Sequence, residues 1–358
     1  MVSSQPVGKV QTVLGPISPK DLGITLTHEH LLLDLRPIAM EKPRGAWQRA
    51  IYEAPLSQDN IGWVRYHEIT NLDNYLLADI DVAIDEAMLY KRFGGGTLVE
   101  ATNPDIGRDA AGLAGISQET GLHIVMGATH YVDVAHPVEM ETWTEDDIVE
   151  EIVNDVLVGV DGTRIKSGII GEIGCSWPLT PNERKVLKAA AKAQAITGAP
   201  MLIHPGRDET SPMELIEIAD KAGADLTHII MAHIDRTVFE KETLLAIAKK
   251  GCYLEWDLFG REQHYYSHNQ NIDMPNDGKK MDDIAWLIGK GYEDQIVVAH
   301  DICTKDRWMK YGGHGYHYLL SQIMPRMRTR GYTDVHINKL FKDNPQRVLT
   351  FRAPKNKK

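Results

Sequence analysis

The sequence predicts a (β/α)8 TIM barrel of the α/β class, and three observations point to this fold. The chain has 358 residues, which is enough for one large domain or two ordinary ones. Short runs of aliphatic and β-branched residues alternate regularly with stretches of helical apolar spacing. Eight such strand–helix pairs over roughly 300 residues indicate parallel βαβ units that close into a barrel. The alternative is an open doubly wound sheet, but no G-x-G-x-x-G motif follows a predicted strand.

The first predicted strand covers residues 24–30 and follows a polar, turn-rich arm over 1–23, which is expected to form a short β-ribbon. The later strands are predicted at 97–101, 123–128, 168–173, 201–204, 228–233, 252–257 and 295–301. The helices that accompany them are predicted at 71–92, 109–120, 145–158, 182–197, 212–222, 243–250 and 282–290. Extra C-terminal helices are predicted at 317–330 and 336–341. Gly121 and Gly198 each follow a predicted helix, where glycine favours a helix end.

The sequence shows no clear domain boundary, so a single domain over 1–358 is expected, with the barrel at 24–345. The segment 36–70, after the first strand, contains three prolines and two tryptophans and is longer than an ordinary connection. Long aromatic loops of this kind commonly serve as a lid or a binding surface. The alternative is that Trp47 and Trp63 only pack the loop onto the barrel.

The chain is acidic, because 50 Asp and Glu residues against 39 Lys and Arg residues give a formal net charge of −11. This balance argues against nucleic acid or an anionic membrane surface as a partner, since both attract clustered Lys and Arg. No stretch approaches the ~18 apolar residues of a membrane span, and the N-terminus has no long apolar signal segment. The three cysteines form no C-x-x-C motif, which argues against a disulfide framework and favours a cytoplasmic location.

Side chains that bind metals stand at the ends of several predicted strands. His28 and His30 end the first strand, and side-chain alternation places them on one face, with Glu29 on the other. Four further candidates stand near the ends of other strands: Glu172, His204, His233 and Asp301. The carboxyl ends of barrel strands meet at the face where active sites of this fold lie, so the six residues are predicted to converge. One such histidine alone is more often structural, and the case for a metal rests on the number of matching strand ends.

Four imidazoles and two carboxylates are more ligands than one catalytic zinc ion takes, because such sites typically have three protein ligands. They suit two divalent ions about 3.5–4 Å apart. We expect Glu172 to bridge the ions, together with a hydroxide that forms because two cations lower the pKa of a bound water. Zinc is the first expectation, and manganese, cobalt and iron accept the same types of ligand.

These residues resemble the amidohydrolase superfamily, and specifically its phosphotriesterase-related family. The likeness extends from Gly8–Gly15 to Asn344-Pro345 and covers nearly the whole chain. In that family an H-x-H pair, a bridging residue on the fourth strand, two further histidines and a final aspartate hold two metals. The resemblance gives these roles to His28, His30, Glu172, His204, His233 and Asp301. Bacterial phosphotriesterases and lactonases have a carboxylated lysine as the bridge, so a glutamate at this position shifts the expected activity away from phosphotriesters.

Four longer motifs are similar to the animal-type subgroup of this family, the N-acetyltaurine hydrolases. They cover 174–180, 204–207, 257–260 and 310–316. The similarity implies hydrolysis of an amide in a small anionic N-acyl amino acid or amino sulfonate. The segment 36–70 does not match the subgroup well, so the substrate is less defined than the family. Esterase, lactonase and phosphotriesterase activities remain alternatives, although Leu258 stands where family lactonases carry arginine.

In this interpretation the bridging hydroxide attacks a carbonyl that one metal polarises, and Asp301 carries the proton to the leaving group. Arg207 and Arg236 follow two ligand-bearing strands and are expected to bind the anionic end of a small-molecule substrate, or else to form loop salt bridges. Tyr131 resembles a family tyrosine that orients the substrate, with packing in the barrel mouth as the alternative. A homodimer is considered because such barrels commonly dimerise. The alternative of another class is a metal-bearing binding protein without catalysis, but all six ligand positions are filled.

Overall fold

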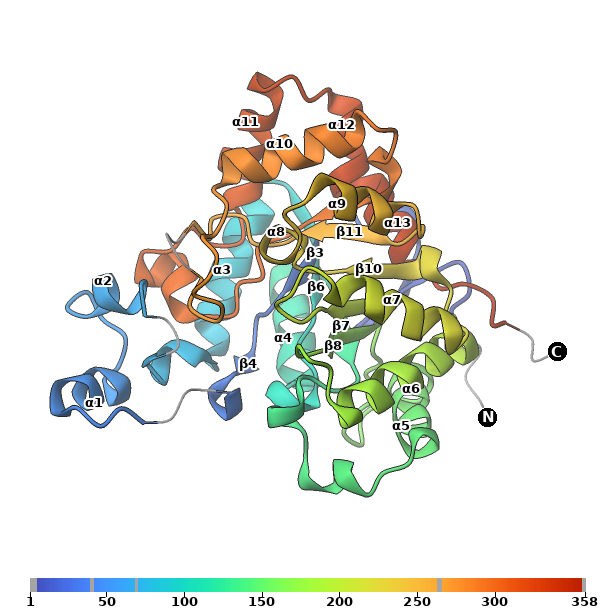
Figure 1. Cartoon of the computed structure of the whole chain (residues 1–358), viewed down its shortest axis with the longest axis horizontal. Helices are drawn as coiled ribbons and strands as arrows, with labels where there is room; N and C mark the ends of the chain where they lie inside the picture. The colour runs from blue at the N-terminus through green and yellow to red at the C-terminus, as the bar shows by residue number, and fades with distance from the viewer. Residues whose placement is uncertain (1–4, 39–41, 68–69, 263–265, 356–358) are drawn as a thin grey trace.

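The computed structural model describes residues 5–38, 42–67, 70–262 and 266–355, and Figure 1 shows its layout. Its centre is an eight-stranded sheet in the spatial order β12-β11-β10-β9-β8-β7-β6-β3. The strands are β3 (Ile24–Glu29), β6 (Gly95–Glu100), β7 (His123–Ala128), β8 (Ile169–Gly174), β9 (Met201–His204), β10 (Ile229–Met231), β11 (Tyr253–Trp256) and β12 (Ile296–Val298). All neighbouring strands in this sheet pair in parallel.

The two edge strands of the sheet, β3 and β12, lie next to each other and nearly close it into a barrel. The Thr27 hydroxyl donates to the Val298 carbonyl at 3.4 Å, and the Asp301 amide donates to the His28 carbonyl at 3.1 Å. The strands also follow one another in sequence order around the sheet, without the reversal that defines a doubly wound fold. The predicted (β/α)8 barrel is therefore confirmed.

Helices alternate with the strands and cover the outside of the barrel (Figure 1). They are α3 (Ile80–Arg92), α4 (Ala110–Thr120), α5 (Glu145–Leu157), α6 (Pro181–Thr197), α7 (Ser211–Lys221), α9 (Lys241–Ala248) and α10 (Asp277–Ile288). Thr144 and Thr180 form capping boxes at the starts of α5 and α6, which satisfy amides that the helices leave free. Gly121 and Gly198 follow α4 and α6 with φ of 66° and 71°, a left-handed conformation that glycine adopts without strain.

Two helices begin at positions that differ from the apolar spacing of the sequence. α3 begins at Ile80 rather than at residue 71, because the Asp79 side chain caps the Val82 amide. The residues before it form β5 (Leu76–Leu77), which pairs antiparallel with β4 (Leu33–Asp34). α10 begins at Asp277 rather than at residue 282, because Asn276 caps its first turn. The short helix α8 (Ile234–Thr237), which the sequence pattern does not predict, comes soon after β10.

Three further parts complete the described chain. β1 (Val10–Thr12) and β2 (Gly15–Ile17) form the antiparallel ribbon expected in the N-terminal arm. The segment 36–70, expected to be irregular, instead contains α1 (Ala46–Glu53) and α2 (Ile61–Val64), which project at one edge of the molecule (left in Figure 1). Its residues 39–41 and 68–69 lie outside the described part. The C-terminal helices are α11 (Met324–Thr329), α12 (Asp334–Asn338) and α13 (Asn344–Leu349), joined to π-helical turns at Leu319–Ile323 and Lys339–Asp343.

The core has two layers, because successive strand residues face opposite sides of the sheet. Leu98 and Ile124 belong to a large cluster that includes helix residues, whereas Val99 and Val125 belong to a second cluster. The second cluster consists mainly of strand residues and fills the barrel interior. Apolar packing therefore holds the strand ends at fixed positions, and the polar side chains described next project from those ends. None of the described helices combines the length and apolar composition that a membrane span requires.

Candidate metal centre

Four histidines and two carboxylates come together at the C-terminal ends of the barrel strands. His28 and His30 leave the end of β3, Glu172 lies on β8, and His204 ends β9. His233 and Asp301 stand just beyond β10 and β12. The relative exposure of each of the six residues is 8% or less. We call these six residues the metal cluster. The structure brings all of them together at the face of the barrel where their positions in the sequence predicted them.

Two members of the metal cluster adopt backbone conformations that non-glycine residues rarely use. The φ angle is 53° at His233 and 49° at Asp301. Such left-handed residues cost about 1–3 kcal/mol each and persist where the surrounding structure fixes them. The carbonyl and amide of Asp301 are both held, the carbonyl by Arg307 Nη1 at 2.8 Å and the amide by the His28 carbonyl at 3.1 Å. The backbone beyond the strands is thus bent in a way that turns both side chains toward the barrel axis.

The Glu172 carboxylate lies between the histidines, with Oε1 facing His30 and Oε2 facing His204, His233 and, at 3.6 Å, His28 Nε2. Its Oε1 lies 3.4 Å from His30 Nε2. Its Oε2 lies 2.8 Å from His204 Nδ1 and 3.8 Å from His233 Nε2. On the other side, His30 Nε2 also lies 3.3 Å from Asp301 Oδ1. A carboxylate with two oxygens facing different ligand groups is the geometry that a bridge between two cations requires.

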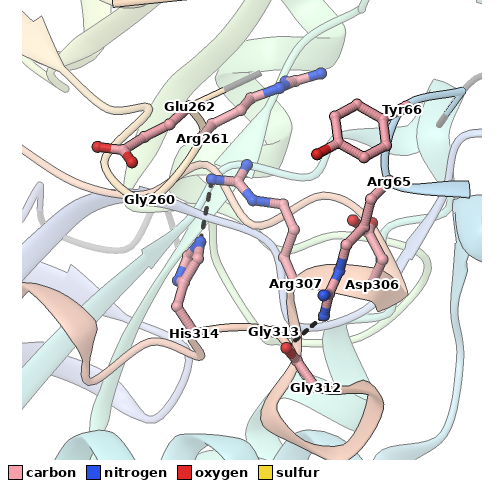
Figure 2. Close-up of a pocket in the computed structure, with 10 residues that line it drawn as sticks. All are labelled: Arg65, Tyr66, Gly260, Arg261, Glu262, Asp306, Arg307, Gly312, Gly313 and His314. Carbon is pink, nitrogen blue, oxygen red and sulfur yellow. Dashed lines mark hydrogen bonds between the residues drawn. The ribbon is translucent and has the colours of Figure 1, made fainter. Parts of the chain in front are cut away.

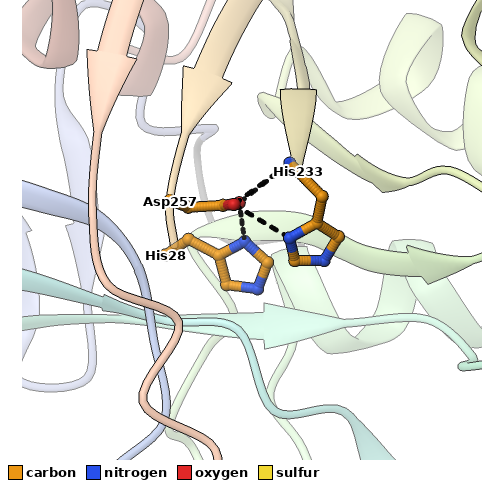
Figure 3. A group of neighbouring side chains, drawn as sticks. All are labelled: His28, His233 and Asp257. Carbon is orange, nitrogen blue, oxygen red and sulfur yellow. Dashed lines mark hydrogen bonds and ion pairs between the residues drawn. The ribbon is translucent and has the colours of Figure 1, made fainter. Parts of the chain in front are cut away.

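Outer hydrogen bonds decide which ring nitrogen of each histidine faces the cluster. Asp257, at the end of β11, accepts from His28 Nδ1 at 3.0 Å and from His233 Nδ1 at 2.9 Å. Figure 3 shows both rings turning one nitrogen toward this carboxylate and the other away from it. Asp257 also accepts the His233 backbone amide at 3.1 Å. One carboxylate therefore fixes the tautomer and orientation of two histidines, as outer partners of metal-binding histidines commonly do.

The Thr102 hydroxyl fixes the orientation of His30 in the same way. The His30 Nδ1 lies 2.9 Å from Thr102 Oγ1, and the Thr102 hydroxyl donates to Glu100 Oε1 at 2.7 Å. Because the hydroxyl proton is used on Glu100, the His30 Nδ1 must be the donor, and in the neutral imidazole that binds metals its Nε2 carries the lone pair that faces Glu172 and Asp301. His28 Nε2 is buried and has no hydrogen-bond partner among the described residues. A buried lone pair without a partner is an unfavourable arrangement that a cation would satisfy.

Three sets of residues have ligand atoms close enough to hold a metal ion. The first is His28, His30 and Asp301, and the second is Glu172, His204 and His233. The third is His28, His233 and Asp257. The first two sets use nitrogens that face the cluster, whereas Asp257 already accepts hydrogen bonds from both histidines of the third. The donors of the first two sets, imidazole nitrogens and carboxylate oxygens, fit two divalent cations.

The charges of the cluster are consistent with cation binding. Although burial alone would raise it, the hydrogen bonds of His204 and His233 hold the pKa of Glu172 well below its usual range. Burial, together with the charge of His233, lowers the pKa of His204 to about 3 and keeps this imidazole neutral. Burial opposes protonation of His30, but hydrogen bonds to Asp301 and Glu172 raise its pKa to about 9. Metal binding would therefore release protons, because histidine binds metals as the neutral imidazole.

A small cavity of about 40 Å³ opens onto the metal cluster and contains the predicted substrate residues. The Tyr131 hydroxyl lies 3.5 Å from His204 Nδ1. Arg236 is buried, and its Nη2 lies 3.1 Å from His204 Nε2. Arg207 also lines the cavity and donates from Nε to the Tyr266 hydroxyl at 3.2 Å. The structure thus brings Tyr131, Arg207 and Arg236 to the same cavity wall.

Sequence reasoning missed three residues that belong to this region. Asp257 ends a predicted strand, and this position could have marked it as an outer partner of the histidines. Arg261 and Tyr266 follow the same strand and line the cavity. They stand in an irregular segment, where no periodicity predicts which side chains turn inward.

A larger hollow of about 410 Å³ lies beside the cavity and shares Arg261 with it (Figure 2). In Figure 2 the Arg307 guanidinium points toward His314, with Nη2 3.5 Å from the imidazole Nε2. Arg65, from the segment that contains α1 and α2, donates to the carbonyl of Gly312 (Figure 2). This hydrogen bond therefore links the segment that contains α1 and α2 to the chain that follows Asp301.

Known proteins of one family match this chain over nearly its whole length. The model of the Phosphotriesterase family matches residues 8–349. The N-acetyltaurine hydrolase of Xenopus tropicalis is 47% identical over 346 residues, covering 96% of this chain and 99% of that protein. The N-acetyltaurine hydrolase of Homo sapiens is 46% identical with the same coverage.

Two solved structures show the likeness in three dimensions. A resiniferatoxin-binding protein from Rhodobacter sphaeroides has a TM-score of 0.91 and 35% identity, covering 96% of this chain and 95% of that chain. A lactonase from Listeria monocytogenes has a TM-score of 0.79 and 27% identity, covering 96% of this chain and 100% of that chain. Both share the barrel described above.

Proposed function

The chain belongs to the phosphotriesterase family and is a metal-dependent hydrolase, and we propose that it hydrolyses the amide bond of a small anionic N-acyl amino sulfonate or N-acyl amino acid. N-acetyltaurine, the substrate in the names of the animal relatives, is the first candidate. The observation that carries the proposal is the charge of the cavity beside the metal cluster. Arg207 and Arg236 both line it, and the hydrogen-bond partners of their side chains within the described residues are hydroxyl, carbonyl and imidazole groups rather than carboxylates.

Enzymes of this family use a binuclear metal centre, and we assign the metal cluster to that role. His28, His30 and Asp301 would hold one ion, His204 and His233 the other, and Glu172 would contact both. When bound, two divalent cations supply a water of lowered pKa and a Lewis acid for the substrate carbonyl. We propose zinc, because its ligand preferences suit imidazole and carboxylate donors, with manganese, cobalt and iron as candidates for the same ligands.

Asp301 is the residue to which we assign proton transfer. Its carboxylate borders the cavity and lies 3.3 Å from His30 Nε2. Hydrolysis adds water across the amide, so a proton must leave the attacking water and reach the departing nitrogen. Although burial opposes it, the hydrogen bond from His30 lowers the pKa of Asp301, which is therefore ionised and able to accept that proton.

The residues opposite Asp301 would bind the acid end of the substrate. Guanidinium groups form paired hydrogen bonds with sulfonate, carboxylate and phosphate groups, and they do so most strongly where water is excluded. Arg207 and Arg236 supply such groups, and Tyr131, whose hydroxyl lies near His204, would orient the acyl part. We further propose a cytoplasmic location, because the cysteine content argues against a disulfide framework. We also propose a homodimer, because such barrels commonly dimerise.

A hydrolysis panel on metal-reconstituted protein tests the proposed bond. N-acetyltaurine, N-acetyl amino acids, γ-lactones and aryl phosphotriesters would be compared by kcat/KM. We expect N-acetyltaurine to give the highest value. Turnover of the phosphotriester alone would overturn the amide assignment. A lactone preference would favour the second candidate, a lactonase, for which the structural likeness to the Listeria monocytogenes lactonase is the supporting observation.

Replacement of Asp301 tests the proton-transfer role separately from the substrate. In Asp301→Asn we expect kcat to fall by about 10²–10⁴-fold, the usual contribution of a general acid–base group. Metal content, measured by elemental analysis, identifies any share of this loss that comes from weaker metal binding. Full activity in this variant would exclude Asp301 as the proton carrier.

A further inference from the structure

Tyr266 occupies a central position beside the metal cluster that the proposed reaction does not explain. It lies after β11, and its side chain is 3% exposed. Its amide donates to the Ile272 carbonyl at 3.0 Å, and its carbonyl accepts the Asn269 amide at 2.9 Å. Leu258 and Met274 pack with it as a small separate core. The turn therefore holds the ring in one place, with the hydroxyl inside the cavity wall.

Three arginines surround this one ring. The guanidinium carbons of Arg261, Arg207 and Arg236 lie 5.1, 5.7 and 6.0 Å from the ring centroid of Tyr266. Guanidinium groups within about 6 Å of an aromatic centroid are attracted to its π electrons. The arginines come from three different loops, after β9, in α8 and after β11. We call Arg207, Arg236 and Arg261 the arginine clamp.

The members of the arginine clamp depend on Tyr266 to different degrees. Arg236 has its own anchors, since it donates to Thr237 Oγ1 and to the Pro205 carbonyl, both at 3.0 Å. The backbone of Arg261 is fixed by the buried Lys280, whose ammonium donates to its carbonyl at 3.1 Å. Within the described chain, the side chain of Arg207 has a single hydrogen bond, to the Tyr266 hydroxyl at 3.2 Å. Tyr266 is thus the group that orients Arg207.

We propose that Tyr266 is the positioning residue of the arginine clamp, and that it determines specificity for anionic over neutral substrates. Its ring supplies a common platform for three like charges, and its hydroxyl turns Arg207 toward the space above the metal cluster. An incoming sulfonate or carboxylate then meets guanidinium groups already in place, so less ordering is needed on binding. The inference rests on the proposed function, because it assumes that the substrate carries an anionic end.

The competing explanation is that Tyr266 only packs its loop, and matched variants separate the two roles. Tyr266→Leu removes the platform and the hydroxyl, whereas Tyr266→Phe keeps the ring and removes only the bond to Arg207. Tyr332→Leu is the packing control, because Tyr332 is also buried but donates its hydroxyl to the Met281 carbonyl, on α10. All variants would be assayed as metal-reconstituted full chains with N-acetyltaurine and with the neutral ester 4-nitrophenyl acetate.

For Tyr266→Leu we expect KM for N-acetyltaurine to rise on the order of tenfold, which corresponds to the loss of one or two cation–π contacts. We expect kcat/KM for the ester to stay within about threefold, because the ester has no charge for the clamp to bind. Tyr266→Phe should give the smaller rise of the two. If kcat/KM fell by the same factor with both substrates, or if KM for N-acetyltaurine were unchanged, the proposal would be overturned. The Tyr332→Leu control should leave the ratio of the two activities unchanged.

Anion binding by the arginine clamp can also be measured without N-acetyltaurine, as the inhibition of ester hydrolysis by ethanesulfonate. If the wild-type protein did not hydrolyse N-acetyltaurine, the proposed function would fail while the clamp could still be measured. We expect the inhibition constant of ethanesulfonate to rise in Tyr266→Leu by the same factor as KM. An inhibition constant that is equal in both proteins would show that Tyr266 does not organise an anion site.

Discussion

The metal cluster and the arginine clamp face the same cavity but are built in different ways. Members of the metal cluster leave strand ends, where paired backbone and a packed barrel interior fix them. The arginine clamp comes from loop and short-helix residues whose side chains converge on one ring. In the cluster, four imidazoles lie together with two carboxylates. In the clamp, three like charges stand together, and Arg207 and Arg236 have no carboxylate partner in the described chain.

The difference in charge balance indicates two different ligands. In the metal cluster, outer partners orient His28, His30 and His233, and the imidazoles and carboxylates together are the ligand types that divalent cations bind. Arg207 and Arg236 have no carboxylate partner among the described residues, so an anion would balance their charge, which is costly to leave unpaired where water is largely excluded. The inner region therefore suits metal ions and the outer region suits the acid end of a substrate. The two regions should respond differently to substitution, and four variants or conditions test this.

Loss of the bridge should have the largest effect, and it should be confined to the metal cluster. In Glu172→Ala we expect metal content to fall below about two ions per chain, with activity toward charged and neutral substrates lost together by at least about 10³-fold. Elemental analysis and ester hydrolysis measure the two effects. Two tightly bound ions in this variant would contradict the bridge assignment.

The next largest effect is expected outside the cluster, at Asp257. Asp257→Asn keeps the size of the side chain but removes the charge that fixes His28 and His233. Changes to such outer partners cost about 10–100-fold in metal affinity or activity. Metal titration would show weaker binding, and excess metal should restore part of the activity. Unchanged metal affinity would mean that the two imidazoles hold their orientation without Asp257.

Substitution in the clamp should affect binding of the substrate rather than the chemical step. For Arg207→Met we expect KM for N-acetyltaurine to rise about 10-fold or more, since a charge-assisted hydrogen bond contributes about 1.5–3 kcal/mol. Metal content and ester hydrolysis should stay near wild type. Arg207→Lys, which keeps the charge without the fork of donors, should recover part of the loss. Equal loss with the neutral ester would place Arg207 in the chemistry of the metal cluster instead.

The smallest effect is a pH dependence that only the clamp should show. Burial opposes ionisation of Tyr266, but the charges of the arginine clamp lower its pKa to about 8. Above this pH a phenolate forms inside the clamp and repels the substrate anion, so KM for N-acetyltaurine should rise a few-fold between about pH 8 and pH 9. Ester hydrolysis should lack this rise, and Tyr266→Phe should remove it. A rise that persists in Tyr266→Phe would assign the titration to another group.

His233 lines the same cavity, and although burial opposes it, the Asp257 carboxylate raises the pKa of His233 to about 9; a bound metal would hold this imidazole neutral. The remaining groups around Tyr266 keep their charge between pH 8 and pH 9. The arginines stay protonated. Burial and the neighbouring arginines hold the pKa of His268 well below its usual value, so that imidazole is neutral. Burial raises the pKa of Tyr75 and Tyr131 well above the usual value, so both phenols stay protonated. Tyr266 is therefore the group expected to change charge near pH 8.

The two regions also differ in how far the sequence predicts them. The metal cluster could be predicted because a parallel barrel gathers its strand ends at one face, and a period of two puts His28 and His30 on the same side of their strand. His28, His30, Glu172, His204, His233 and Asp301 could be named in this way. The glutamate at position 172, where the family resemblance places a bridging residue, was also visible in the sequence.

Only the tertiary structure showed which loop residues meet. Arg261 and Tyr266 are close in sequence, yet the partners that complete the clamp, Arg207 and Arg236, come from other loops. Their convergence depends on packing across distant segments, and loops have no repeating geometry from which it could be derived. The double role of Asp257 likewise depends on two histidines that are far from it in the chain. The positions of residues at strand ends predicted the candidate ligands, whereas long-range contacts decided what surrounds them.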